Sequence, residues 1–188
     1  MSTINPTQTA LLIMDYQIGI ADKLPAIDSL TEKVNQTADA ARTAGIKVIF
    51  TKVGFQEGHP EIGSNSMPFF QQVKEKNMFA NEQSRLIPQI KVATGDAVID
   101  KKRFSSFAGS NLSLILHANG IQHLVLAGVR TAGVVLSTLR LAADTDYRVT
   151  VLADCCADPD PEIHKVLIEK VFPLQAEVVS SEEWIKSL

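Results

Sequence analysis

The 188-residue chain has only two cysteines, and they cannot form a conventional structural disulfide bond. Cys155 and Cys156 are adjacent in the sequence, and neighbouring residues close only a strained disulfide ring. They also lack the spaced cysteine and histidine partners of a structural zinc site. Stability must therefore come from a packed core, which is feasible because a domain of this size buries roughly 70% of its unfolded surface.

A strong charge of one sign is absent, and so are long hydrophobic runs. The chain has 18 Lys and Arg against 21 Asp and Glu, a formal net charge of only −3, which makes nucleic acid and anionic membranes poor partners. No apolar run approaches the roughly 20 residues of a membrane-spanning helix. Residues 1–8 are polar, without the pattern of a secretion signal. We expect one cytoplasmic domain, residues 1–188, that binds neither nucleic acid nor membrane.

What the sequence does contain is a regular alternation of short apolar runs and helical patterns. Strands are expected at residues 10–14, 47–53, 97–100, 123–127, 148–153 and 176–179. Helices are expected at 30–44, 111–119, 134–144, 161–171 and 181–188, and residues 54–68 form the longest loop, followed by short helical pieces to about residue 90. Alternating strands and helices predict a three-layer α/β/α sandwich around a mainly parallel sheet.

Ligands of such sheets bind beyond the carboxyl ends of the strands, which directs attention to three segments. Asp15 directly follows the first strand, where partial burial would suit acid–base chemistry, although an Asp that accepts a backbone hydrogen bond fits equally. The basic residues 101–103 follow the third strand, either as a solvated turn or as a partner for Asp15. Residues 128–135 lead into a helix whose first N–H groups can hold an anion, but they lack the spacing of a nucleotide-binding loop.

Together the three segments resemble the isochorismatase-like hydrolases, a family that includes nicotinamidases, N-carbamoyl amidohydrolases and isochorismatases. The matching motifs are Ala-Leu-Leu-Ile-Met-Asp-Tyr-Gln at residues 10–17, Lys-Lys-Arg-Phe-Ser-Ser-Phe at 101–107 and Ala-Gly-Val-Arg-Thr-x-x-Val-Val-x-x-Thr at 127–138. The resemblance implies a Rossmann-like, six-stranded parallel sheet in the order 3-2-1-4-5-6. It also implies a small-molecule substrate and a homo-oligomer.

The resemblance places the catalytic acid–base group at Asp15 and a catalytic lysine at Lys101, which precedes an x-Arg-aromatic-Ser pattern. In the implied order the first and third strands lie about 9.6 Å apart, a gap that a long lysine side chain can largely cover. After the second strand the family's nicotinamidases carry an Asp-x-His metal motif, whereas this chain has Thr-Lys-Val-Gly-Phe at residues 51–55. We therefore expect no metal, and no other cofactor.

The decisive departure from the family is Val134, which occupies the place of the cysteine nucleophile. Valine has no nucleophilic or ionisable group, so thioester chemistry at this position is excluded. Cys155 and Cys156, expected just after the fifth strand, are alternative nucleophiles or buried structural residues. The hydroxyls of residues 105, 106 and 131 lie near the same edge, but no histidine is spaced to activate them.

The turn after the fourth strand is expected to stabilise an oxyanion through the backbone N–H groups of Arg130 and Val134. The resemblance also implies a cis peptide between Val129 and Arg130. The Arg130 side chain points either inward, toward a substrate carboxylate, or outward to the surface.

Substrate contacts are also expected from Gln17, Phe55 and Phe107. The two phenylalanines have favourable loop positions for an apolar pocket wall. Phenylalanines at residues 69, 70 and 104 lie near the same edge. For each of these phenylalanines, a core or dimer contact is the alternative.

True isochorismatases also lack the cysteine, because cleavage of their vinyl ether needs only an acid that protonates the enol carbon and a water that adds afterwards. We therefore expect a hydrolase that acts on a vinyl ether or a related acid through Asp15 and Lys101, without a covalent cysteine intermediate. Two alternatives remain. One is a catalytically silent member that binds a small molecule or serves as an oligomeric scaffold, and the other is an amide hydrolase with a displaced nucleophile such as Cys156.

Overall fold

A single parallel sheet forms the centre of the molecule. The computed structural model describes residues 4–21, 24 and 27–188. Its strands are β1 (Thr9–Met14), β2 (Lys47–Val53), β3 (Ala97–Lys101), β4 (His123–Val129), β5 (Arg148–Ala157) and β6 (Glu177–Val179). They pair in parallel in the order β3-β2-β1-β4-β5-β6, which confirms the expected topology.

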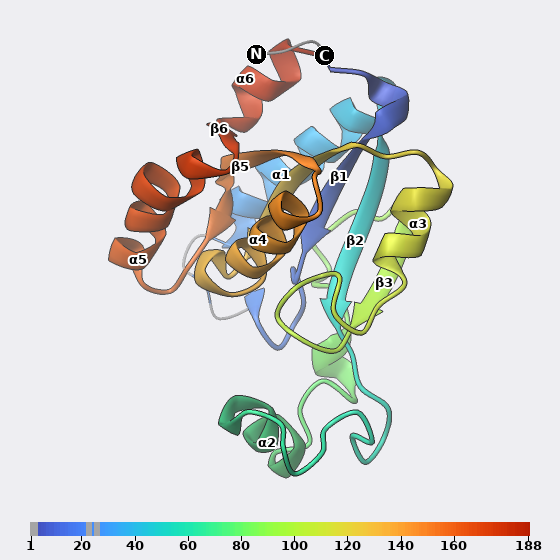
Figure 1. Ribbon diagram of the computed structural model, residues 1–188, viewed down its shortest axis with the longest axis vertical. Coiled ribbons are helices and arrows are strands. Elements are labelled where there is room, and N and C mark those ends of the chain that lie inside the picture. The colour runs from blue at the N-terminus through green and yellow to red at the C-terminus, as the bar shows by residue number, and fades with distance from the viewer. Residues whose placement is uncertain (1–3, 22–23, 25–26) are drawn as a thin grey trace.

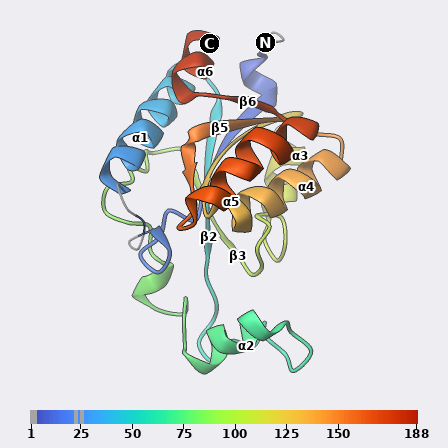
Figure 2. The same ribbon diagram turned by 90° about the vertical axis from the view of Figure 1, so that its left-hand side faces the viewer.

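Helices cover both faces of this sheet, as Figures 1 and 2 show. α1 (Ile27–Thr43) and α6 (Ser181–Lys186) lie on one face. α3 (Leu112–Ala118), α4 (Leu136–Asp144) and α5 (Pro161–Val166) lie on the other. α2 (Pro68–Glu75) stands apart, beyond the carboxyl ends of the strands. Shorter helical turns are η1 (Pro6–Gln8), η3 (Glu82–Ser84), η4 (Thr131–Val135), η5 (Leu167–Val171) and η6 (Phe172–Leu174).

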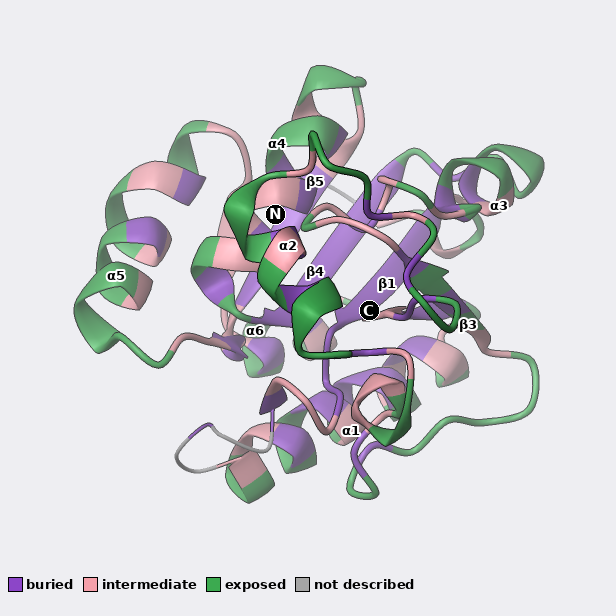
Figure 3. Cartoon of the chain, turned by 90° about the horizontal axis from the view of Figure 1, so that it is seen from below, coloured by how far each residue is buried: buried purple, intermediate pink, exposed green. Residues whose placement is uncertain are grey.

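The central strands are apolar because both of their faces are buried. β1 and β4 are buried along their whole length, and Figure 3 shows them in the interior between helices whose outer surfaces are exposed. Successive side chains of a strand point to opposite faces, so Leu12 and Leu126 join the core under α3 and α4, whereas Leu11 and Val125 join the core under α1. None of the described helices is long and apolar enough to cross a membrane.

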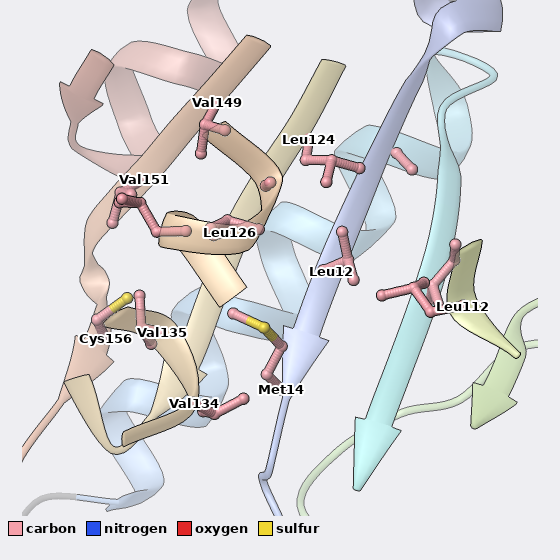
Figure 4. Packing of buried hydrophobic residues seen from close by; sticks show 14 of the residues in the cluster. Leu12, Met14, Leu112, Leu124, Leu126, Val134, Val135, Val149, Val151 and Cys156 are labelled. Carbon is pink, nitrogen blue, oxygen red and sulfur yellow. The ribbon is translucent and has the colours of Figure 1, made fainter. Parts of the chain in front are cut away.

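The junction between β1, β4 and the following turn depends on a glycine. A Cβ atom on Gly128 would lie 3.0 Å from both Met14 Cβ and Val135 Cγ2. Such separations are tighter than ordinary packing allows, so this close approach favours glycine. Figure 4 shows Val135 and Met14 at this end of the two strands, with Val134 beside them.

Two boundaries differ from the expectations in ways that affect the site. β5 continues to Ala157 rather than ending at residue 153, so Cys155 and Cys156 lie inside the strand and not after it. The register of β5 against β4 shifts between Leu126 and Gly128 of β4, and regular pairing resumes where Gly128 faces Cys156. The helix expected from residue 134 is preceded by the π-helical turn η4, so Val134 belongs to the turn.

Candidate active site

The position of Asp15 is set by the end of β1. The chain leaves the strand through a left-handed backbone conformation at Asp15, with φ of 61°, a region that Asp tolerates better than most residues. The Asp15 N–H donates to the carbonyl of Thr51 on β2 at 2.8 Å. The residue is only 4% exposed, so its carboxyl group lies at the carboxyl edge of the sheet but away from bulk solvent.

Lys101 reaches Asp15 across the intervening strand β2. It is the last residue of β3 and is 1% exposed. Its ammonium group lies 3.0 Å from Asp15 Oδ2 and donates to the carbonyls of Arg103 at 2.8 Å and Phe104 at 3.0 Å. Three oxygen partners therefore offset the cost of burying the lysine charge.

Opposing effects set the proton affinity of Asp15. Burial raises its pKa, and the neighbouring Lys101 lowers it, with a resulting pKa of about 6 against an ordinary value of 3.8. Asp15 Oδ2 is held by Lys101, whereas Oδ1 is buried and has no hydrogen-bond partner within the described residues. The carboxyl group therefore keeps one oxygen available and can gain or lose a proton near neutral pH.

The turn after β4 forms a further wall of the site. The peptide between Val129 and Arg130 is cis, as the resemblance implies. Val134 is 2% exposed and lines the same cavity as Arg130 and Asp15, so the family's cysteine position carries an aliphatic side chain at the cavity wall. The carbonyl of Arg130 accepts from the N–H groups of Gly133 at 3.1 Å and Val135 at 3.4 Å, which fixes the turn.

These groups surround a small and mostly apolar cavity of about 200 Å³. Its charged lining residues are Asp15, Lys101, Arg103 and Arg130. The apolar lining comes from β2, from the turn after β1, from the segment around α2 and from the turns after β3 and β4, and consists of Ile20, Val53, Phe69, Phe70, Val73, Met78, Phe79, Phe104, Val129 and Val134. The cavity thus gathers side chains that are far apart in the sequence.

Three residues expected to contact substrate lie outside the lining of this cavity. Gln17 is fully buried, and its side-chain amide donates to the carbonyls of Val53 and Gln83 and accepts from the N–H of Val53, so it braces the backbone. Phe55 packs in a small separate core with the aromatic residues around α2. Phe107 packs against Tyr147, with ring centroids 6.1 Å apart. None of the three is among the residues that line the cavity.

Other aromatic residues take their place, and sequence reasoning identified only some of them. Phe69, Phe70 and Phe104 line the cavity and lie at the expected edge. Phe79 was not anticipated, and it lies beside Gly19, where an added Cβ atom would come 2.6 Å from the Phe79 ring. The signal in the sequence was the glycine close to Asp15, because glycine in such a position marks a close approach of another segment.

The two cysteines are poorly placed to act as nucleophiles. Both are buried, and neither lines the cavity around Asp15. Burial raises the pKa of the Cys155 thiol to about 12 and that of Cys156 further still. Because the thiolate is the reactive form, neither residue has the properties of an activated cysteine.

One hydroxyl does have a histidine partner, contrary to the expectation. The Thr131 hydroxyl lies 2.8 Å from His164 Nδ1 on α5, a contact that the sequence separation concealed. Thr131 is fully buried and is not among the cavity-lining residues, so this pair anchors the turn to α5. Ser106 is likewise buried, between Thr51 and Thr138.

The described residues were also considered as possible ligands of a metal ion. Over the described part of the chain, no three His, Cys, Asp or Glu side chains come together in a way that could hold a metal ion. The charged residues that line the cavity are Asp15, Lys101, Arg103 and Arg130.

Comparisons with known proteins find relatives over most of the chain. The isochorismatase domain model matches residues 9–183. Ureidoacrylate amidohydrolase RutB from Pantoea ananatis is 31% identical, with the match covering 84% of this chain and 72% of that protein. The corresponding protein from Stutzerimonas stutzeri is 29% identical, over 83% and 72% of the two chains.

Solved structures extend the likeness to the whole chain. An isochorismatase family protein from Burkholderia thailandensis superposes with a TM-score of 0.84 at 26% identity, covering 99% of this chain and 97% of its own. N-carbamoylsarcosine amidase from Thermoplasma acidophilum has a TM-score of 0.72 at 25% identity, over 93% and 97% of the chains. With the domain model spanning nearly the entire sequence, the chain belongs to the isochorismatase family of hydrolases.

Proposed function

We propose that the protein hydrolyses a small organic molecule, a vinyl ether or a related acid, with Asp15 as the proton donor and Lys101 as the group that holds and tunes it. The observation that carries this proposal is the unpartnered Oδ1 of Asp15 beside an apolar cavity. A pKa of about 6 leaves a useful fraction of Asp15 protonated near neutral pH, as general acid catalysis requires.

The proposed reaction needs only Asp15, one water molecule and the substrate. Asp15 transfers its proton to the terminal carbon of the enol ether, and positive charge develops on the neighbouring carbon and its ether oxygen. Water adds to that carbon and returns a proton to Asp15, which restores the acid. The carbon–oxygen bond of the resulting hemiketal then breaks as its hydroxyl proton transfers to the leaving oxygen, so that a ketone and an alcohol leave.

Val134 supports a route without a covalent intermediate. An aliphatic side chain stands where the family's nucleophile would stand, and it lines the cavity with 2% exposure. Amide hydrolysis with a displaced cysteine has less support, because both thiols lie outside the cavity lining and have raised pKa values. The named activities of the relatives, ureidoacrylate amidohydrolase and N-carbamoylsarcosine amidase, support small-molecule hydrolysis in general.

The test is release of pyruvate from isochorismate, followed through a coupled dehydrogenase that consumes NADH. We expect turnover by the protein, a loss of at least about a hundredfold in Asp15→Asn, in line with general acid catalysis, and unchanged turnover in Asp144→Asn. Asp144 is an exposed aspartate on α4 and serves as the matched control. Turnover that survives in Asp15→Asn contradicts the role of Asp15. An absence of turnover in the unmodified protein rejects isochorismate as the substrate.

A further inference from the structure

The cavity around Asp15 carries an excess of positive charge. Of the residues that the structure places in its lining, Asp15 is the single acid, whereas Lys101, Arg103 and Arg130 are cationic. Most of the remaining lining is aliphatic or aromatic. Low-dielectric walls strengthen the field of the charges between them, so the cavity favours an anion with an apolar body.

Two of these three cationic side chains, those of Lys101 and Arg103, already have partners within the protein. The Lys101 ammonium pairs with Asp15 and donates to two backbone carbonyls. The Arg103 guanidinium donates to the carbonyls of Lys102 at 2.7 Å and Glu61 at 2.9 Å, and it lies over the Phe70 ring at 4.8 Å. These contacts engage all three donors of Lys101 and two of the donors of Arg103, and they hold the turn after β3 and the segment before α2.

Arg130 differs from both, because its guanidinium has no partner among the residues that the structure describes. Its backbone is fixed at the start of η4, and the residue is exposed while still lining the cavity, which places it at the mouth. Within the described part of the chain, no hydrogen bond or ion pair joins its side chain to another residue. The planar guanidinium offers two parallel donors that match a carboxylate.

We propose that Arg130 selects the substrate by binding a carboxylate group on a compact apolar molecule, while the reacting end of that molecule lies at Asp15. The anion contact needs only Arg130, whereas the position of the reacting end rests on the proposed function. The cavity volume of about 200 Å³ lies below the range of roughly 300–1,000 Å³ for drug-sized ligands. The substrate is therefore a small carboxylate, such as one ring with a short side chain.

Benzoate and benzamide test this proposal, because they share a ring and differ by one negative charge. Binding is measured by titration calorimetry at low salt with the full chain. We expect benzoate to bind at least about tenfold more tightly than benzamide, and Arg130→Gln to raise the benzoate Kd by about tenfold while leaving the benzamide Kd within about twofold. Arg130→Lys should restore only part of the affinity, because it keeps the charge but loses the paired donors.

Controls separate this effect from a general loss of charge. Arg140→Gln removes an exposed arginine on α4 and should leave both affinities unchanged. Added salt should weaken the binding of benzoate more than that of benzamide, because salt screens a contact at the cavity mouth. Three results would overturn the proposal. They are equal affinity for the two compounds, no detectable benzoate binding, and a benzoate Kd that is unchanged in Arg130→Gln.

Failure of the Arg130 contact can be distinguished from failure of the proposed function of Asp15. If Asp15→Asn leaves turnover intact while Arg130→Gln still weakens benzoate binding, the acid role fails and the anion contact stands. If Asp15→Asn abolishes turnover while Arg130→Gln has no effect on benzoate, the anion contact fails alone.

Discussion

Asp15 and His123 are buried titratable residues whose pKa values move in opposite directions. Burial raises the pKa of Asp15 from 3.8 to about 6, against the effect of Lys101. Burial and the nearby Arg148 lower the pKa of His123 from 6.5 to about 4. The His123 ring lies between the hydroxyls of Thr9 and Thr150, with ring nitrogens 3.4 Å and 2.9 Å away, an environment that favours the neutral form.

These shifts predict opposing effects on stability over nearly the same pH window. The native state binds the Asp15 proton more tightly than the unfolded state, so the Asp15 contribution is complete below about pH 3.8 and is lost as pH rises through about 6. The His123 contribution is complete above about pH 6.5 and is lost as pH falls through about 4. Each is worth about 3 kcal/mol at most, from the size of the shift.

Urea unfolding from pH 4 to 7 measures the two contributions separately. Relative to the unmodified protein, the unfolding free energy of Asp15→Asn should rise by about 2–3 kcal/mol across this window, because the variant lacks the penalty of ionisation. For His123→Gln, the unfolding free energy relative to the unmodified protein should fall by a similar amount from pH 4 to 7, because the variant lacks the histidine that destabilises the native state at low pH. Difference curves that are flat, or that have the opposite slopes, contradict the assigned pKa directions.

The segment between β2 and β3 is the element that completes the site. It carries α2 and a small core of its own, formed by Phe55, Ile62, Phe70, Val73 and Phe79. Figure 1 shows it extending beyond the sheet edge. Gln17 joins this segment to the sheet, since its amide bonds to Val53 at the end of β2 and to Gln83 in η3. This buried amide is therefore one of the contacts that hold the aromatic wall in place, together with the bond from Arg103 to the Glu61 carbonyl.

Gln17→Ala should loosen this segment while the sheet remains folded. The change leaves the N–H of Val53 and two carbonyls without their side-chain partner, at a cost of about 3 kcal/mol. Hydrogen exchange should become faster in residues 54–85 and stay slow in β1 and β4. Gln36→Ala, at an exposed position on α1, is the matched control. Unchanged exchange in residues 54–85 contradicts the bracing role.

Over the whole molecule, the sequence predicted what depends on local pattern and strand order. Short apolar runs located the six strands to within a few residues for most of them. The family motifs located Asp15 and Lys101, which meet because the order β3-β2-β1 leaves one strand between them. The family motif also identified Val134 as the residue at the cysteine position, and it lines the cavity.

The remainder depends on long-range contacts that no local pattern records. Phe79 enters the cavity because the segment between β2 and β3 folds back onto the turn after β1. Phe55 and Phe107 have equally suitable loop positions but turn into other packing clusters. Cys156 lies within β5 because the strand resumes pairing after an irregularity. Each of these outcomes is decided by packing between segments far apart in the sequence.

The pH dependence of kcat/KM for pyruvate release from isochorismate tests the central claim most directly. If Asp15 donates the proton, the reactive form is the protonated one, so kcat/KM should be level below about pH 6 and fall about tenfold per pH unit above it. A kcat/KM that rises through pH 6 would mean that ionised Asp15 acts as a base. That result, or a profile with no break near pH 6, contradicts the acid role assigned to Asp15.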